Sequence, residues 1–222
     1  MPLNCQQIKI LIEAINAYDF PKKTYDFINK KEIKYTSMRQ LEASIQENLT
    51  SGDIILVQDG LSNILYWGYY RTGYRDTRVN NFRSKVDQQQ LIYATKIFQN
   101  LSETGIRIIK NLKLPEFSNL SFISKIRMFL DPKQYVILDR KLMKLAKTNT
   151  ITLFHDVKEY PTSIPCSLEN ERIYQNWCNI CKIASKKYFQ NEELFAVDIE
   201  RGIFHLIENN QSEIAANIIA DI

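Results

Sequence analysis

Apolar residues recur at the spacing of α-helices along most of this chain. The first such segment carries apolar residues at the spacing i, i+3, i+4 and i+7, which places them on a single helix face: Ile8, Leu11, Ile12 and Ile15. Pro21 ends this segment, because proline cannot continue a helix. The same spacing predicts further helices over residues 91–98, 106–112, 167–189 and 199–206, and after Ser212. The sequence therefore predicts an all-α protein.

One short segment has the character of a β-strand. Residues 53–58, with the sequence DIILVQ, are apolar and partly β-branched at consecutive positions. A strand of this length is too short to anchor a sheet, so it does not change the expected fold class.

The length of 222 residues suits one substantial core or two small lobes. The best places for the chain to cross between lobes are the break at residues 113–117 (KLPEF) and the stretch 161–165 (PTSIP). We expect one helical domain, 1–222, in which residues 1–50 plus 150–222 form one lobe and residues 51–149 the other.

The composition argues against membrane, export and metal functions. No stretch of about 18 uncharged apolar residues is present, and no basic segment followed by an apolar run begins the chain, so we expect a cytoplasmic protein. Cys178 and Cys181 form a CxxC pair within a helical pattern, but only His155 and His205 are available as further ligands alongside Cys5 and Cys166. We expect free thiols, no metal and no cofactor.

Charge is distributed unevenly around a net value of +4. Residues 71–85 carry five bases and one acid, and residues 107–147 carry ten bases and three acids. Residues 155–222 instead carry six bases and eleven acids. This pattern suits a surface that faces a polyanion, and it equally suits ordinary solvated helix faces.

Residues 120–147, LSFISKIRMFLDPKQYVILDRKLMKLAK, are the most informative stretch. The apolar residues of 122–130 form one helix face with Lys125 at its edge, from which the side chain could reach a groove. Pro132 stops this helix, an extended apolar segment covers 135–138, and Asp139 stands where the next helix begins. Taken alone, Asp139 is a typical helix N-cap, and Lys125 is a lysine whose stem covers apolar surface.

The segment SKIRMFLDPKQYVILDRKL resembles the lysine helix, bend and aspartate of the helix-hairpin-helix DNA glycosylases, the superfamily that includes 8-oxoguanine glycosylases. The resemblance covers roughly 30 of the 222 residues and implies a two-lobed helical fold. It implies that Asp139 supports base removal and that Lys125 is the lysine of bifunctional members. The hairpin of typical members is rich in glycine, whereas LPEFSNLSF has none, and the cysteines after Asp139 are too few for the iron–sulfur cluster of some members.

An aromatic and arginine-rich segment precedes this stretch. Base removal from a duplex requires the base to be flipped out, which favours aromatic surfaces beside cations that hold the backbone. We therefore expect DNA or base contacts from Trp67, Tyr69, Arg71, Tyr74, Arg75 and Arg78, together with Lys133 and Gln134. The alternative is a buried aromatic helix followed by a solvated, salt-bridged one.

The segment NILYWGYYRTGYRDTRVNNFRSKV resembles uncharacterised bacterial proteins, some of them linked to phage defence. Together the resemblances imply a DNA glycosylase that acts on double-stranded DNA, with a modified phage base such as glucosylated hydroxymethylcytosine as its target. We expect a monomer. Two alternatives stay open: a non-catalytic DNA-binding or adaptor protein on the same scaffold, and a helical protein-interaction module.

Overall fold

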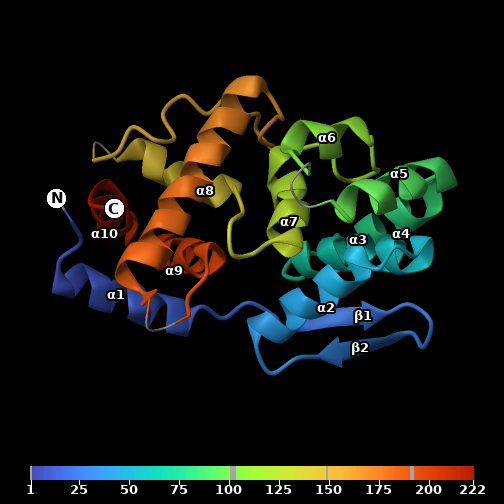
Figure 1. The fold of residues 1–222 in the computed structure, drawn as a ribbon. Helices are drawn as coiled ribbons and strands as arrows, with labels where there is room; N and C mark the ends of the chain where they lie inside the picture. The colour runs from blue at the N-terminus through green and yellow to red at the C-terminus, as the bar shows by residue number, and fades with distance from the viewer. Residues whose placement is uncertain (1, 101–103, 149, 191–192) are drawn as a thin grey trace. The chain divides into compact units, whose positions relative to one another are not determined.

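The computed structural model describes residues 2–100, 104–148, 150–190 and 193–222. Helix makes up 61% of the structure and strand 6%, which confirms the all-α class. Figure 1 shows the elements, which in chain order are α1 (Cys5–Ala17), β1 (Lys23–Asp26), β2 (Lys31–Lys34), α2 (Met38–Thr50), α3 (Ile54–Gly68), α4 (Arg75–Lys85), α5 (Gln88–Phe98), α6 (Ile106–Asn111), α7 (Leu120–Leu130), the 3₁₀ helix η2 (Arg140–Lys147), α8 (Leu168–Tyr188), α9 (Ala196–Glu208) and α10 (Ser212–Ala220).

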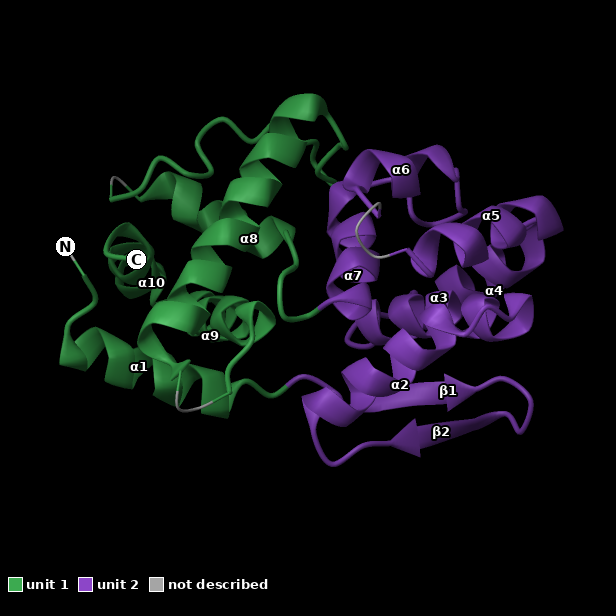
Figure 2. Cartoon of the chain, in the orientation of Figure 1, with its two compact units in different colours: residues 1–19, 132–222 green, residues 20–131 purple. Residues whose placement is uncertain are grey.

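The chain forms two compact units (Figure 2). Unit 1 comprises residues 1–19 and 132–222, and unit 2 comprises residues 20–131. These boundaries differ from the expected lobes, which were divided at 50/51 and 149/150. The hairpin β1–β2 and helix α2 pack on α3 and so belong with unit 2, whereas η2 packs on α9 and α10 and so belongs with unit 1.

Unit 2 is built around α3. Helices α2, α4, α5 and α7 and strand β1 all pack against it, so the second half of α3 is buried on every side. Gly68 allows the close approach of α7, because a Cβ atom at this position would lie 2.8 Å from the ring of Phe122. The apolar run in α3 is therefore the centre of the unit 2 core.

The expected strand at residues 53–58 is wrong, because this segment begins α3. Asp53 caps the helix, and its carboxylate accepts hydrogen bonds from the backbone N–H groups of Ile55 and Leu56 at 2.7 and 3.1 Å. A helix buried on all sides shows the same continuous apolar run as a buried strand, so periodicity alone does not separate the two.

The strands of unit 2 lie elsewhere, in an antiparallel hairpin that pairs Lys23 with Lys34 and Asp26 with Lys31. The Asp26 carboxylate accepts from the backbone N–H groups of Ile28 and Asn29, and Lys30 takes a left-handed φ of 52°. Asp26 and Lys30 thus shape the turn. The apolar spacing that was used to find helices does not detect such turn residues.

Unit 1 confirms the helices that were expected at both ends of the chain. Helix α1 packs along α9, where Gly202 allows the approach, since a Cβ atom there would lie 2.7 Å from Leu11 Cδ1. Helix α8 packs against α9 and begins after Ser167, whose hydroxyl accepts from the Asn170 N–H at 3.1 Å, as the sequence predicts for a cap. Over the described ranges, no helix has both the length and the apolar character needed to cross a membrane.

Candidate active site and nucleic-acid interface

Asp139 lies in unit 1 at the start of η2, where it is half-buried. Its Oδ1 accepts a hydrogen bond from the backbone N–H of Lys141 at 3.1 Å, so the expected N-cap is confirmed. The helix that it caps is a 3₁₀ helix rather than an α-helix.

The segment that carries Asp139 is held firmly in unit 1. Val136 and Leu138 are fully buried, and the indole N–H of Trp177 in α8 donates to the carbonyl of Ile137 at 3.2 Å. On the other side of Asp139, Lys141 pairs with Glu208 of α9. Contacts on both sides therefore fix the backbone from which the carboxylate projects.

Lys125 lies in unit 2 and is only 5% exposed. Its ammonium donates to the carbonyl of Ser121 at 3.1 Å and lies 4.6 Å from the ring centre of Phe122. Ten of the eleven residues of α7 are buried, so the expectation of an edge position facing a groove is wrong. The spacing of apolar residues identifies one packed face, but here neighbouring helices cover the remaining faces as well.

Tyr69 and Arg78 are brought together in unit 2. The ring of Tyr69 stacks on Phe122 with a centroid distance of 4.4 Å, and the guanidinium of Arg78 lies 5.7 Å from the centre of the Tyr69 ring. Burial raises the pKa of Tyr69. Arg78 also pairs with Glu116 at 2.9 Å, so this cation is already bound to a carboxylate of the same unit.

Glu116 lies in the glycine-free turn between α6 and α7. It has a left-handed φ of 68°, its side chain is only 8% exposed, and it accepts hydrogen bonds from both Arg78 and Asn81 of α4. Lys113 in the same turn has a φ of 51°. Two positions of this turn thus adopt the backbone conformation that glycine adopts most easily.

Arg75 belongs to a second cluster, between α4, α3 and the hairpin. Its guanidinium lies 4.2 Å from the ring centre of Tyr66 and 5.2 Å from that of Tyr70, and 3.7 Å separates it from the carboxylate of Glu32. Glu32 accepts from the hydroxyl of Tyr66 at 2.5 Å and from Lys23 at 2.9 Å. The hydrogen bond from Tyr66 lowers the pKa of Glu32 most, and the hydrogen bond from Lys23 lowers it further.

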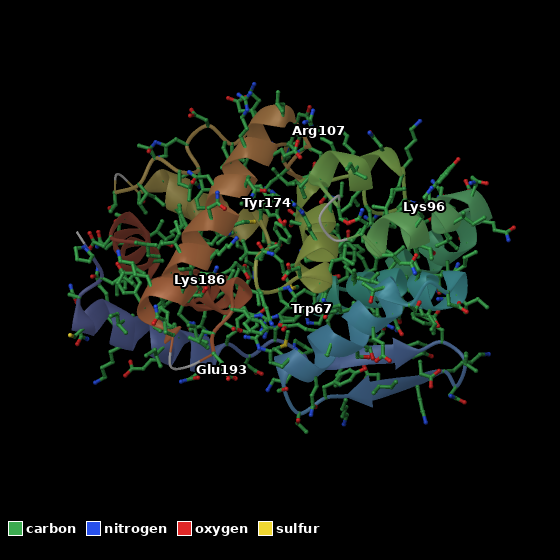
Figure 3. The ribbon with its side chains drawn as sticks, viewed as in Figure 1. Trp67, Lys96, Arg107, Tyr174, Lys186 and Glu193 are labelled. Carbon is green, nitrogen blue, oxygen red and sulfur yellow. The ribbon has the colours of Figure 1, made fainter. Side chains whose placement is uncertain are left out.

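The remaining residues of the aromatic segment differ in exposure. Trp67, labelled in Figure 3, is 2% exposed, and its ring contacts Phe20 and Phe129, so its assignment to the DNA-facing set is corrected. Arg71 is exposed, with its guanidinium 4.9 Å from the ring centre of Phe20, and Tyr74 is 64% exposed. The first half of the aromatic segment therefore belongs to the core, as the alternative of a buried aromatic helix predicts. Its second half lies on the surface.

Lys133 and Gln134 are exposed in unit 1, in the turn before the Asp139 segment. The ammonium of Lys133 lies 5.2 Å from the ring centre of Phe195, and the Gln134 side chain accepts from Lys182 at 2.8 Å. Both side chains are therefore exposed and in contact with neighbours on the surface that precedes Asp139 in the chain.

The cysteines are all free thiols, and Cys178 and Cys181 are buried within α8. Burial raises the pKa of the Cys181 thiol well above its ordinary value. Among the described residues, no group of three or more His, Cys, Asp and Glu side chains is placed to hold a metal ion.

Sequence reasoning missed the residues that the hairpin contributes. Lys23 and Glu32 were not singled out, yet they complete the cluster around Arg75. A signal was available in the alternation of Tyr25, Phe27, Ile33 and Tyr35 around a polar turn.

Comparison with known protein families, curated proteins and solved structures found no match to this chain.

Proposed function

We propose that the chain is a DNA glycosylase that flips a damaged or modified base out of double-stranded DNA and hydrolyses its N-glycosidic bond. The observation that carries the proposal is Asp139. Its carboxylate is half-buried and fixed by the Lys141 N–H, at the end of a segment anchored by Trp177. It lies in the part of the sequence that resembles the aspartate segment of helix-hairpin-helix glycosylases.

The chemistry requires a carboxylate held in this way. As the bond between the base and the sugar breaks, positive charge develops on the sugar, and a nearby carboxylate stabilises that charge or orients the attacking water. A carboxylate that is already fixed loses little freedom when the transition state forms. We assign this role to Asp139.

The DNA contacts that we propose come from exposed or partly exposed residues. In unit 2, Arg71 and Tyr74 are exposed and Tyr69 is partly exposed, and in unit 1 Lys133 and Gln134 are exposed. The basic side chains of Arg140, Lys144 and Lys147 follow Asp139 and suit contacts with phosphates. We propose a modified phage base, such as glucosylated hydroxymethylcytosine, as the target.

Strand cleavage through Lys125 is a separate question from base removal. A lysine attacks the sugar only through its unprotonated amine, and the product is a Schiff base that borohydride reduces to a stable adduct. Because the Lys125 side chain is only 5% exposed and its Nζ donates to the Ser121 carbonyl inside unit 2, it lacks access to a sugar, and we propose hydrolysis without this step. An adduct that is lost in Lys125→Met would replace the hydrolytic mechanism with the lyase mechanism.

The test of the proposed function is incubation of the protein with duplexes that contain candidate modified bases, or with modified phage DNA, followed by detection of abasic sites. We expect abasic sites from the wild-type protein and their loss in Asp139→Asn. Asp156→Asn is the matched control, because Asp156 is an exposed aspartate of the same unit.

A second candidate, a non-catalytic DNA-binding or adaptor protein, is favoured by one observation. The turn between α6 and α7 directs the carboxylate of Glu116 towards Arg78 and Asn81, and this acidic group disfavours a phosphate at the same place. This candidate predicts salt-dependent DNA binding without abasic sites, and no effect of Asp139→Asn.

A further inference from the structure

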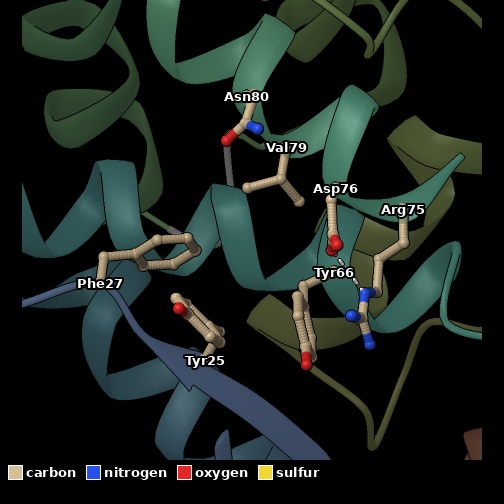
Figure 4. A pocket seen from close by; sticks show the side chains of 7 residues that line it. All are labelled: Tyr25, Phe27, Tyr66, Arg75, Asp76, Val79 and Asn80. Atoms are coloured by element: carbon tan, nitrogen blue, oxygen red, sulfur yellow. Dashed lines mark hydrogen bonds and ion pairs between the residues drawn. The ribbon is translucent and has the colours of Figure 1, made fainter. Parts of the chain in front are cut away.

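A pocket in unit 2 lies outside the residues proposed for base removal. It is lined by the β1–β2 hairpin, α3 and α4, is open on one side and has a volume of about 280 Å³ (Figure 4). Small-molecule pockets commonly measure about 300–1,000 Å³, so this one suits a single ring system rather than a longer ligand.

Aromatic rings form one side of the pocket. Tyr25 and Phe27 come from the hairpin and Tyr66 from α3. The rings of Tyr25 and Phe27 meet edge to face at 5.2 Å, and those of Tyr25 and Tyr66 lie 5.5 Å apart with an angle of 31°. Such an array offers ring faces and edges to a flat, aromatic ligand.

Helix α4 supplies the polar side. Asp76 and Asn80 are four residues apart and so lie on the same face of the helix, with Val79 between them as an apolar surface. One oxygen of Asp76 accepts from the Nε of Arg75 at 2.8 Å, which leaves the carboxylate further capacity to accept. The amide of Asn80 offers both a donor and an acceptor.

The walls are held in place before any ligand arrives. Tyr66 donates to Glu32, and the guanidinium of Arg83 lies 4.2 Å from the ring centre of Phe27 while it pairs with Asp59. The backbone of Tyr25 bonds to the side chain of Asn63 in both directions, at 2.7 and 3.2 Å. A pocket with fixed walls loses little conformational freedom on binding.

We propose that this pocket binds a single heteroaromatic ring that carries amino or imino N–H groups, as an unpaired nucleobase does. The rings of Tyr25 and Phe27 contact the ligand's ring, Asp76 accepts from its N–H groups, and Asn80 pairs with its remaining edge. Arg75 also lines the pocket and pairs with Asp76 at 2.8 Å, so the polar side offers an uncharged ring both a carboxylate acceptor and a neighbouring cation. The site goes beyond the proposed excision and does not require Asp139.

The same ring chemistry is presented by a base in a single strand and by a free nucleoside, and two probes distinguish them. One is 2-aminopurine riboside, and the other is a single strand of abasic spacers that contains one 2-aminopurine. Both report stacking through quenching of the base fluorescence. An identical strand made only of spacers measures contacts with the backbone alone.

We expect the wild-type protein and Asp139→Asn to quench at least one probe equally well. Phe27→Ala should weaken that binding about fivefold or more, because it removes a ring on which the base stacks. Asn80→Ala should weaken it about fivefold, because it removes the amide that pairs with the edge of the ligand's ring. Thr77→Ala is the matched control on α4, since Thr77 is exposed and does not line the pocket. If Phe27→Ala fails to fold, Asn80→Ala, which changes an exposed helix residue, carries the test alone.

Quenching of the free riboside assigns the site to nucleosides, and quenching of the strand alone assigns it to nucleic acid; either supports ring binding. The proposal is overturned if neither probe is quenched, or if Asn80→Ala and Thr77→Ala bind alike. Loss of excision in Asp139→Asn with unchanged quenching separates this site from the catalytic one.

Discussion

At the scale of single residues, Asp139 has a structural role that is observed and a catalytic role that we propose. The cap is visible in the hydrogen bond from the Lys141 N–H. The proposed catalysis needs the negative charge as well as the position. Asparagine preserves an N-cap about as well as aspartate does but carries no charge, so the two roles can be measured separately.

We expect Asp139→Ala to lower the free energy of unfolding by about 1 kcal/mol, because it removes the cap. Asp139→Asn should change this free energy by much less, because the amide oxygen still accepts from Lys141. Urea denaturation of both variants measures the difference. An equal loss in the two variants would mean that the charge, and not the cap, stabilises this segment.

Lys113 gives a second prediction at this scale. Its φ of 51° is unfavourable for a residue with a Cβ atom, by about 1–2 kcal/mol. Lys113→Gly should therefore stabilise unit 2, by about 1 kcal/mol after the greater freedom of glycine in the unfolded chain is included. The control is Lys96→Gly in α5, which should be destabilising by about 1 kcal/mol, and the same sign in both variants would contradict the argument.

For single residues, the sequence predicted the helix caps better than it predicted burial or ion-pair partners. Ser167 and Asp139 were expected to cap helices because a cap depends on neighbours in the chain, and both do so. The burial of Lys125 depends on helices that cover α7 from other parts of the chain, and the pairing of Arg78 with Glu116 joins residues 38 positions apart. The spacing of residues along the chain therefore predicts neither the burial of Lys125 nor the ion pair of Arg78.

At the scale of elements, periodicity identified most helices and missed the hairpin. Helices α5, α6, α8, α9 and α10 lie where the apolar spacing predicted them. The run DIILVQ was assigned as a strand because its apolar residues are continuous, whereas α3 is continuous in apolar residues because it is buried on all sides. The β1–β2 hairpin has strands of only four residues, too short for a strong alternating pattern.

The contact between the hairpin and α3 gives a prediction on pH. The pKa of Glu32 is lower in the folded protein, chiefly through the Tyr66 hydrogen bond, so the stability it contributes is present above the ordinary pKa of glutamate. This stability is lost as the pH falls through the lowered pKa of the folded state. Because the side chain is 32% exposed, solvent screening limits the contribution to about 0.5–1 kcal/mol.

We therefore expect Glu32→Gln to lower the free energy of unfolding at pH 7 and to have little effect at a pH below the folded pKa. Denaturation at a series of pH values measures this, with Glu47→Gln as the control, since Glu47 is an exposed glutamate of α2. A difference that stays constant down to the most acidic pH would show that the Glu32 charge is not responsible.

At the scale of the whole molecule, the two units differ in charge. Unit 2 contains 17 Lys and Arg and 11 Asp and Glu residues, whereas unit 1 contains 12 Lys and Arg and 14 Asp and Glu residues. Unit 2 therefore has a net charge of +6 and unit 1 of −2. The basic unit also carries the exposed residues of the aromatic segment, which suits the proposed contact with DNA.

The proposed contact predicts a salt dependence. The logarithm of the affinity for duplex DNA should fall linearly with the logarithm of the salt concentration, by about 0.9 for each phosphate neutralised. Arg71→Ala should reduce the magnitude of this slope by about 1, because it removes one exposed cation from unit 2. Arg172→Ala, which changes an exposed arginine of α8, should leave the slope unchanged, and equal effects of the two would place the DNA elsewhere.

The most direct test of the central proposal is the single-turnover rate of abasic-site formation on duplexes that carry a modified base, such as glucosylated hydroxymethylcytosine. We predict excision by the wild-type protein and by Asp156→Asn. In Asp139→Asn the rate should fall by about 10²–10³-fold, the usual effect of removing one electrostatic contact with a transition state, while urea denaturation shows an intact fold. Excision by Asp139→Asn at the wild-type rate would contradict the assignment of this carboxylate to catalysis.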